Sequence, residues 1–163
     1  MNQEKNLSKS AQIIHDFLYQ KGVSCEVKEL DSSTRTAKDA ADTLGCGVAQ
    51  IVKSLLFRTE QTHKPVLVLA SGVNQVNERL VGSLINEPIR KADADFTREI
   101  TGFAIGGVPP VGHKQVINTV LIDEDLLHHQ VLWAAAGTPN AVFSLAPDEL
   151  KQLTNGIVVK VRE

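Results

Sequence analysis

The chain has 163 residues, of which 42% are hydrophobic and 22% charged, so we expect residues 1–163 to form one globular domain around one core. The formal net charge is −2, from 17 basic and 19 acidic side chains, which argues against a broad basic surface that wraps nucleic acid. Aromatic residues make up only 4%, which disfavours an extended stacking platform for single strands. These totals are compatible with a small basic pocket that binds one phosphate-rich end of a nucleic acid.

No apolar run reaches the ~20 residues that a membrane-spanning helix needs, and residues 1–10 are polar, without the apolar core of a signal peptide. The two cysteines, Cys25 and Cys46, are too few for a disulfide framework and lack metal-ligand spacing. The five histidines do not cluster. We therefore expect a cytoplasmic protein with no membrane contact, no metal and no cofactor.

The predicted elements follow from capping residues and apolar periodicity. Ser8, Thr36, Asn77 and Asp93 are good N-cap residues, and Pro147 suits the first turn of a helix. In chain order the sequence predicts a helix over 8–21, a strand over 23–30, a polar loop over 31–35, a helix over 36–45, strands over 53–58 and 65–70, a helix over 77–85, a strand over 89–92, a helix over 93–102, a strand over 116–123, a helical turn over 125–129, strands over 131–135 and 141–145, a helix over 147–155 and a strand over 157–161.

The order of these elements favours one fold class. Residues 65–70 are apolar at nearly every position, so this strand is expected at the centre of a sheet that is covered on both faces. Several predicted strands follow one another without an intervening helix, whereas a doubly wound sheet alternates more regularly. We therefore expect an α+β fold, in which helices pack on a mixed sheet.

The glycine-proline segment over residues 106–112 is the first candidate functional feature. Its glycines allow close approach of a ligand or another backbone, and its prolines stiffen the loop. The amides of Gly106 and Gly107 suit a carbonyl oxygen on which negative charge develops. A purely structural turn between two strands explains the same residues. The segment lacks the Gly-Lys-Ser/Thr ending of a nucleotide-binding P-loop.

Two further features suggest a pocket. Strand alternation places Lys53 on the same face as Leu55 and Phe57, where a cation at a pocket mouth could hold a phosphate, carboxylate or ester carbonyl. The alternative is a lysine at a strand end whose ammonium group reaches water. The small residues over 134–138 form either a pocket wall or a close contact between backbones.

The common catalytic motifs are missing from this sequence. It has no Gly-x-Ser-x-Gly elbow, no His-Glu-x-x-His pair and no Gly-x-Gly-x-x-Gly turn. An enzyme with this sequence is therefore expected to work by positioning its substrate and through backbone amides rather than through a protein nucleophile.

Three segments, in this order, resemble the YbaK/ProX family of aminoacyl-tRNA deacylases, which is related to the editing domain inserted in some prolyl-tRNA synthetases. They are Thr-Ala-Lys-Asp-Ala-Ala at 36–41, Ile-Val-Lys-Ser-Leu-Leu-Phe at 51–57 and the Thr-Gly…Gly-Gly-Val-Pro-Pro-Val-Gly stretch at 101–112. Val-Leu-Ile-Asp at 120–123 and Ala-Ala-Gly at 135–137 extend the likeness, which covers about residues 10–160. The resemblance implies a mixed, partly barrel-like sheet surrounded by helices.

The resemblance also implies an activity, the hydrolysis of the ester that joins a wrong amino acid to the 3′ end of tRNA. Lys53 matches the family's essential lysine, which is thought to hold the substrate near its terminal phosphate or carbonyl. Gly106 matches the glycine whose backbone contacts the reacting carbonyl. A ribose hydroxyl of the terminal adenosine is thought to help activate water, which agrees with the missing triad and metal. Substrate contacts are expected from Leu30, Thr36, Gly107, Val108, Pro109, Ala135, Gly137 and Thr138.

One position departs from part of the family. Members that act on cysteinyl-tRNA carry an aspartate shortly after the last glycine turn, where this chain has Val142. The identity of the amino acid that is removed therefore stays open.

The leading hypothesis is a trans-editing hydrolase that meets the acceptor end of mischarged tRNA-Pro, with prolyl-tRNA synthetase as a second candidate partner. Such an enzyme would be a second, hydrolytic sieve, because one methylene changes binding by only about 1–3 kcal/mol. Candidate phosphate contacts are Arg58, Arg79, Arg90, Lys91, Arg98 and Lys114. Two other hypotheses remain open: a non-catalytic module that binds aminoacyl-tRNA or a synthetase, and a small hydrolase for another ester.

Overall fold

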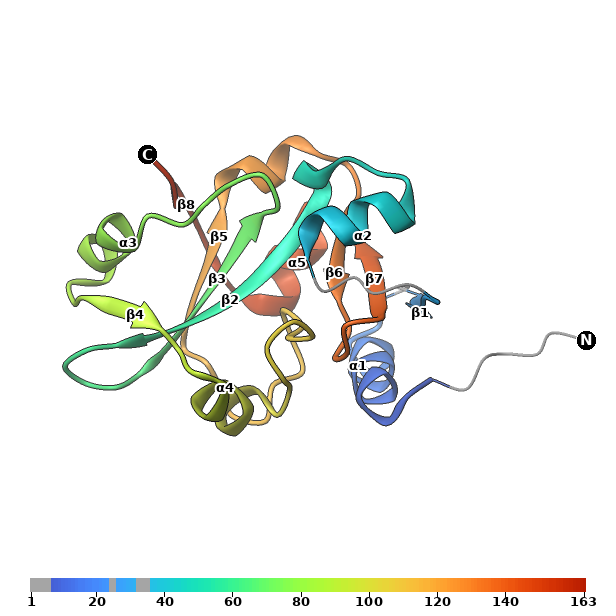
Figure 1. Cartoon of the computed structure of the whole chain (residues 1–163), viewed down its shortest axis with the longest axis horizontal. Helices are drawn as coiled ribbons and strands as arrows, with labels where there is room; N and C mark the ends of the chain where they lie inside the picture. Colours follow the sequence, from blue (N-terminus) through green and yellow to red (C-terminus); the bar gives the residue numbers. More distant parts are fainter. Residues whose placement is uncertain (1–6, 24–25, 32–35) are drawn as a thin grey trace, which may run out of the picture.

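The structure is a computed structural model that describes residues 7–23, 26–31 and 36–163. Within these residues, eight strands form one mixed sheet in the order β1-β7-β6-β2-β3-β5-β8, and β4 pairs with β2 outside this path (Figure 1). The strands are β1 (Val27–Glu29), β2 (Ile51–Thr59), β3 (Pro65–Ser71), β4 (Ile89–Lys91), β5 (Thr119–Asp123), β6 (Leu132–Ala135), β7 (Ala141–Leu145) and β8 (Ile157–Val159). The helices are α1 (Lys9–Gln20), α2 (Ala37–Leu44), α3 (Glu78–Ile85), α4 (Ala94–Thr101) and α5 (Pro147–Thr154), with short 3₁₀ turns η1 (Val48–Gln50) and η2 (Glu124–His128).

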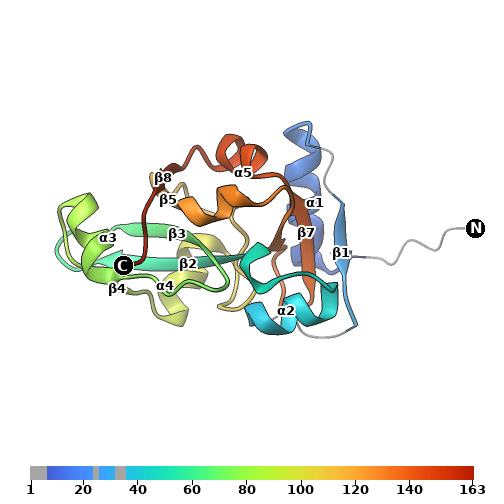
Figure 2. The ribbon, with the colours of Figure 1, turned by 90° about the horizontal axis from the view of Figure 1, so that it is seen from above.

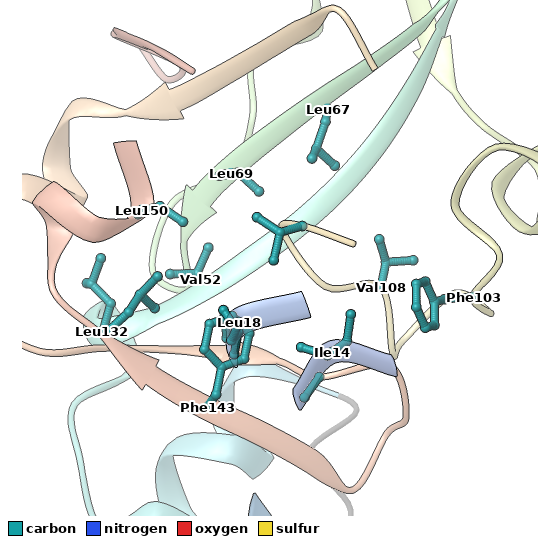
Figure 3. Packing of buried hydrophobic residues seen from close by; sticks show 14 of the residues in the cluster. Ile14, Leu18, Val52, Leu67, Leu69, Phe103, Val108, Leu132, Phe143 and Leu150 are labelled. Atoms are coloured by element: carbon teal, nitrogen blue, oxygen red, sulfur yellow. The ribbon is translucent and has the colours of Figure 1, made fainter. Parts of the chain in front are cut away.

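The two sides of the sheet are covered by different helices, because alternate side chains of each strand point to opposite faces. Leu67 and Leu69 of β3 join a large cluster with α1, α5 and the loop after α4 (Figure 3). Val66 and Val68 of the same strand pack in a second cluster with Val81 of α3. The prediction that residues 65–70 form a central strand covered on both faces is thus confirmed.

The α+β class with a mixed sheet is also confirmed. β2 and β3 are antiparallel, whereas β3 and β5, and β5 and β8, run parallel. Seen from above, β1 and β7 run across the direction of β2 and β3, so the sheet bends strongly near β6 (Figure 2). This bend agrees with the expectation of a partly barrel-like sheet.

The helix ends follow the predicted capping residues. The side-chain oxygens of Thr36, Asn77 and Asp93 accept hydrogen bonds from backbone N–H groups three residues later, at 3.0, 3.0 and 2.8 Å. Gly45 ends α2 in the left-handed conformation, with φ of +70°. Each of these helices lies within a residue or two of its predicted range because its signals are local.

The strand ends differ more from prediction, because a strand ends where its pairing partner ends. β5 begins at Thr119, the residue that pairs with Val66 of β3, rather than at residue 116. β1 begins at Val27 rather than at residue 23, and β8 ends at Val159 rather than at residue 161. Cys25 and most of the predicted 31–35 loop lie outside the described residues.

The described residues contain neither a membrane-spanning helix nor a cluster of metal-binding side chains. Within residues 7–23, 26–31 and 36–163, no helix is long and apolar enough to cross a bilayer. In the same part of the chain, no three histidine, cysteine, aspartate or glutamate side chains gather where they could hold a metal ion.

Candidate functional site

The candidate site lies where strand β2 loses its neighbour on one side. β3 pairs with β2 at every residue from Val52 to Arg58. On the opposite side, β6 pairs only with Ile51 and Val52, and β4 pairs only with residues 57–59. In the part of the chain that the structure describes, residues 53–56 therefore face a gap in the sheet instead of another strand.

Backbone groups of β2 point into this gap. In an antiparallel pair, alternate residues direct their N–H and C=O groups away from the partner strand. The carbonyl of Leu56 points to the side away from β3, because it accepts a 3.1 Å hydrogen bond from the N–H of Ala92, the residue after β4. Ser54 lies two residues earlier, so its N–H and C=O point to the same side, into the gap. The hydroxyl oxygen of Ser54 is buried and has no partner in the described residues.

A cavity of about 490 Å³ occupies the gap. This volume is within the range of ligand pockets, about 300–1,000 Å³. Every residue from 51 to 57 lines the cavity, so it runs along the edge of β2 and reaches side chains from both faces of that strand. The other lining residues are Thr36, Ala37, Ala40, Lys91, Ala92, Thr97, Ile105, Gly106, Val108, Trp133, Ala134, Ala135 and Val142.

The charges at the cavity are positive. Lys53 and Lys91 are the only ionisable residues among the described lining residues, which include no histidine, cysteine or acid. Burial lowers the pKa of Lys53, the negative charge of Asp123 raises this pKa, and the positive charge of Lys91 lowers it. The ammonium group of Lys53 donates a hydrogen bond to the backbone carbonyl of Asn74. Since an ammonium group has three donors, two remain for a ligand.

Gly106 presents its backbone to this cavity from a tight turn. The N–H of Gly107 donates to the carbonyl of Ala104 at 3.0 Å, and Gly106 has φ of +96°. The turn therefore runs from Ala104 to Gly107, and of its two central residues only the second, Gly106, has a positive φ. This is the pattern of a type II turn, which favours glycine at that position. The N–H of Gly106 has no partner among the described residues, so it is free to donate to a ligand oxygen.

Gly107, Gly137 and Thr138 lie behind the cavity and are not among the described residues that line it. The carbonyl of Gly107 accepts from the N–H of Gly137 at 3.0 Å. A Cβ on Gly107 would lie only 2.9 Å from the Cα of Thr138. These residues let two backbones pack closely, which is the structural explanation that the sequence left open for both segments.

Of the other residues predicted to contact the substrate, three line the cavity and two do not. Thr36, Val108 and Ala135 line the cavity with Lys53 and Gly106. Leu30 and Pro109 do not. The N–H of Leu30 donates to the carbonyl of Asn140 at 2.8 Å, and Pro109 is buried with its carbonyl accepting from His113 at 2.7 Å.

Ser54 and Trp133 are among the lining residues that the sequence did not identify as site residues. Lys53 and Ser54 together interrupt an otherwise apolar stretch over residues 51–57, which is a weak signal for a pocket. Trp133 pairs with Ile51 across β6 and β2 and packs among the residues under α2, and no sequence pattern placed it at the cavity. Of the candidate phosphate contacts, Lys91 lines the cavity, whereas the guanidinium of Arg58 lies over the Phe96 ring at 5.0 Å.

Comparison with known proteins gives consistent matches. The profile of a family described as the aminoacyl-tRNA editing domain matches residues 31–153. The uncharacterised protein YwhH of Bacillus subtilis is 30% identical over 129 residues, which cover 79% of this chain and 81% of that protein. A protein of Enterococcus faecalis, EbsC, described as a candidate Cys-tRNA(Pro)/Cys-tRNA(Cys) deacylase, is 26% identical over 121 residues, which cover 74% of this chain and 73% of EbsC.

A solved structure agrees over nearly the whole chain. It is described as a candidate trans-editing enzyme for prolyl tRNA synthetase and superposes with a TM-score of 0.91 at 45% sequence identity. The match covers 97% of this chain and 99% of that one.

Proposed function

The chain belongs to the aminoacyl-tRNA editing domain family, and from that premise we propose that it is a trans-editing deacylase acting on mischarged tRNA-Pro. Residues 1–163 would act as a single editing domain, in the cytoplasm, where tRNA is charged. The observation that carries the proposal is that Lys53 and the unpaired N–H of Gly106 line one cavity.

The cavity supports a mechanism in which the substrate supplies part of the chemistry. The ammonium groups of Lys53 and Lys91 would attract the terminal phosphate or ester carbonyl. As water attacks that carbonyl, the N–H of Gly106 would donate to the oxygen on which negative charge develops. The bond between the carbonyl carbon and the ribose oxygen then breaks, and the ribose oxygen takes one proton of the attacking water. The amino acid leaves as a carboxylate once the second proton has passed to solvent. Because no described lining residue is a histidine or acid, a ribose hydroxyl of the substrate is the proposed group that activates water.

The walls of the cavity support an uncharged amino acid side chain as the group that is removed. Val108, Ala134 and Val142 are apolar and buried. A charged side chain against these residues would lose its hydration without gaining a partner. Apolar walls discriminate mainly by size, at about 1–3 kcal/mol per methylene.

The test is the release of amino acid from tRNA-Pro charged with a panel of small amino acids. Lys53→Met keeps most of the side-chain stem but removes the charge, and it should lower kcat/KM about 100-fold or more. Lys151→Met, on the exposed surface of α5, is the matched control and should match wild type. Equal rates for Lys53→Met and wild type would overturn the assignment of Lys53.

A non-catalytic binding module is the second candidate, and the absence of an acid or histidine among the described lining residues is what favours it. In that case the protein would bind charged tRNA in the same assay and release no amino acid from any member of the panel. A hydrolase for some other ester would instead cleave free amino-acid esters as fast as charged tRNA.

A further inference from the structure

The backbone carbonyl that contacts Lys53 belongs to a loop that is fixed from several sides. This loop runs from the end of β3 to the start of α3 and contains Asn74, which is 8% exposed. The N–H of Asn74 donates to the carbonyl of Ser71 at 2.9 Å, and its carbonyl accepts from the ammonium group of Lys53. Both backbone groups of Asn74 are therefore used.

The side chain of Asn74 is held by two carboxylates. Its amide nitrogen donates to Oδ2 of Asp123 at 2.8 Å and to Oδ2 of Asp125 at 2.7 Å. Asp123 is 1% exposed and also accepts from the N–H groups of Ser71 and Asp125, at 3.0 and 2.9 Å. A carboxylate with this many donors is well fixed, so the amide it holds is fixed as well.

The segment after β8 closes the arrangement from outside. Nε of Arg162 donates to Oδ2 of Asp125 at 2.8 Å, and the carbonyl of Val161 accepts from the N–H of Asn77 at 2.7 Å. The hydrogen bonds from Arg162 and Asn74 lower the pKa of Asp125. Asp125 therefore stays charged at neutral pH and continues to accept from Asn74.

The contact to Lys53 has a specific electrostatic character. The neutral carbonyl of Asn74 accepts from the ammonium group of Lys53. No described carboxylate oxygen lies within 4.0 Å of that ammonium nitrogen, so the described residues form no ion pair with it. The group is thus held without being neutralised, so it can still attract an anionic or carbonyl ligand. The charges that act on it from neighbouring elements are those of Asp123 at the end of β5 and Lys91 in β4.

We propose that Asn74, Asp123, Asp125 and Arg162 are positioning residues that hold the ammonium group of Lys53 at the cavity. The inference rests on the proposed function, in which Lys53 contacts the substrate. Asn74 acts directly through its carbonyl, Asp123 and Asp125 act through Asn74, and Arg162 acts one contact further away.

The first arm of the test compares two asparagines in the same loop. Asn74→Ala should lower kcat/KM for deacylation about tenfold to 100-fold, because a displacement of about 1 Å at a positioned group has an effect of that size. Asn77→Ala is the matched control, because it removes the side-chain cap of α3 in the same loop but leaves the backbone N–H that donates to Val161 in place. The side chain of Asn77 has no hydrogen bond to Lys53, Asn74, Asp123 or Asp125. Arg162→Met should give a smaller loss than Asn74→Ala. Equal losses in Asn74→Ala and Asn77→Ala would overturn the inference.

The second arm measures Lys53 itself by a side-chain NMR titration and by the pH dependence of deacylation. Asp123→Asn removes a charge that raises the pKa of Lys53, while burial and Lys91 continue to lower it. The titration and the alkaline fall in activity should therefore move to lower pH. Lys91→Met should move the NMR titration in the opposite direction.

The outcomes separate this inference from the proposed function. If Lys53→Met abolishes deacylation but Asn74→Ala and Arg162→Met match wild type in rate and pH profile, the positioning inference is wrong and the proposed function stands. If wild type releases no amino acid from any charged tRNA, the proposed function fails, and the NMR titration in Asn74→Ala still decides whether the network controls Lys53. If Lys53→Met is as active as wild type, the assignment of Lys53 to the reaction fails, and the same titration decides the positioning inference. An unchanged titration in Asn74→Ala would overturn the inference even if Asp123→Asn does not fold.

Discussion

The close approach of two backbones behind the cavity makes Gly107 the most informative position for a substitution. In Gly107→Ala, the added Cβ would lie 2.9 Å from the Cα of Thr138 and 3.0 Å from the carbonyl carbon and oxygen of Gly137. All three atoms belong to the backbone, so no side chain can rotate away. The two segments must separate by about 0.5 Å or more to restore ordinary van der Waals contact.

The size of the effect follows from this geometry. Overpacking of this kind costs about 1–3 kcal/mol, and a loss of about 2 kcal/mol lowers the Tm of a domain of this size by roughly 4–8 °C. The separation of the two backbone segments also displaces the adjacent N–H of Gly106 in the cavity, so the rate of deacylation should fall by about tenfold to 100-fold. Thermal unfolding followed by circular dichroism, and single-turnover release of amino acid from tRNA, measure the two effects.

The matched control is Gly47→Ala. Gly47 has φ of −76°, and a Cβ there would meet only Oε1 of Gln50, at 3.6 Å. Its Tm should stay at or slightly above that of wild type. If Gly107→Ala has the same Tm as Gly47→Ala and keeps full deacylation activity, the packing argument is wrong. A lowered Tm with unchanged activity would show that the position of Gly106 does not depend on this contact.

Two further predictions concern the core and the pH dependence of stability. Phe143 is 0% exposed and belongs to the larger cluster, so Phe143→Ala should lower the free energy of unfolding in urea by about 3–5 kcal/mol. A loss below about 1 kcal/mol would contradict its placement. Burial lowers the pKa of His113, although its contact with the Pro109 carbonyl raises it, so protonation favours the unfolded state. Wild-type stability should therefore fall as the pH drops below about 6.5, the ordinary histidine value, and His113→Gln should weaken this dependence. An identical dependence in the two proteins would exclude His113 as its source.

Local signals in the sequence predicted the helix ends well. The strand ends were predicted less well, because they depend on which strand each one pairs with. Thr36, Asn77 and Asp93 cap their helices as expected because a cap needs only the next three residues. The start of β5 depends on Val66, more than 50 residues earlier in the chain, and no local pattern contains that information.

At the candidate site, too, the sequence predicted features that depend on local motifs and missed those that depend on packing. Strand alternation and the glycine-proline loop point to Lys53 and Gly106, the resemblance assigns them roles, and the two residues line one cavity. The sequence could not tell whether the small size of Gly107 and Gly137 leaves room for a ligand or for another segment, because that depends on which backbone packs against them. In the structure Gly107 packs against the backbone of Gly137 and Thr138, and Gly137 packs against the Ser10 backbone and the Phe103 ring. The contacts of Asn74 join three separate regions of the chain, so they were equally inaccessible to a reading of motifs.

The gap beside β2 has a consequence for how this cavity tolerates sequence change. The N–H and C=O groups that Ser54 offers to the cavity belong to the peptide backbone, so replacement of its side chain by most other residues leaves them in place. Their direction is dictated by the register with β3, in which Ser54 pairs with Leu69. The backbone there is already ordered before a ligand arrives, so binding loses little conformational entropy at this position. These polar features of the cavity are thus specified by the topology of the sheet, while the side chains around them are free to vary and adapt the pocket to different ligands.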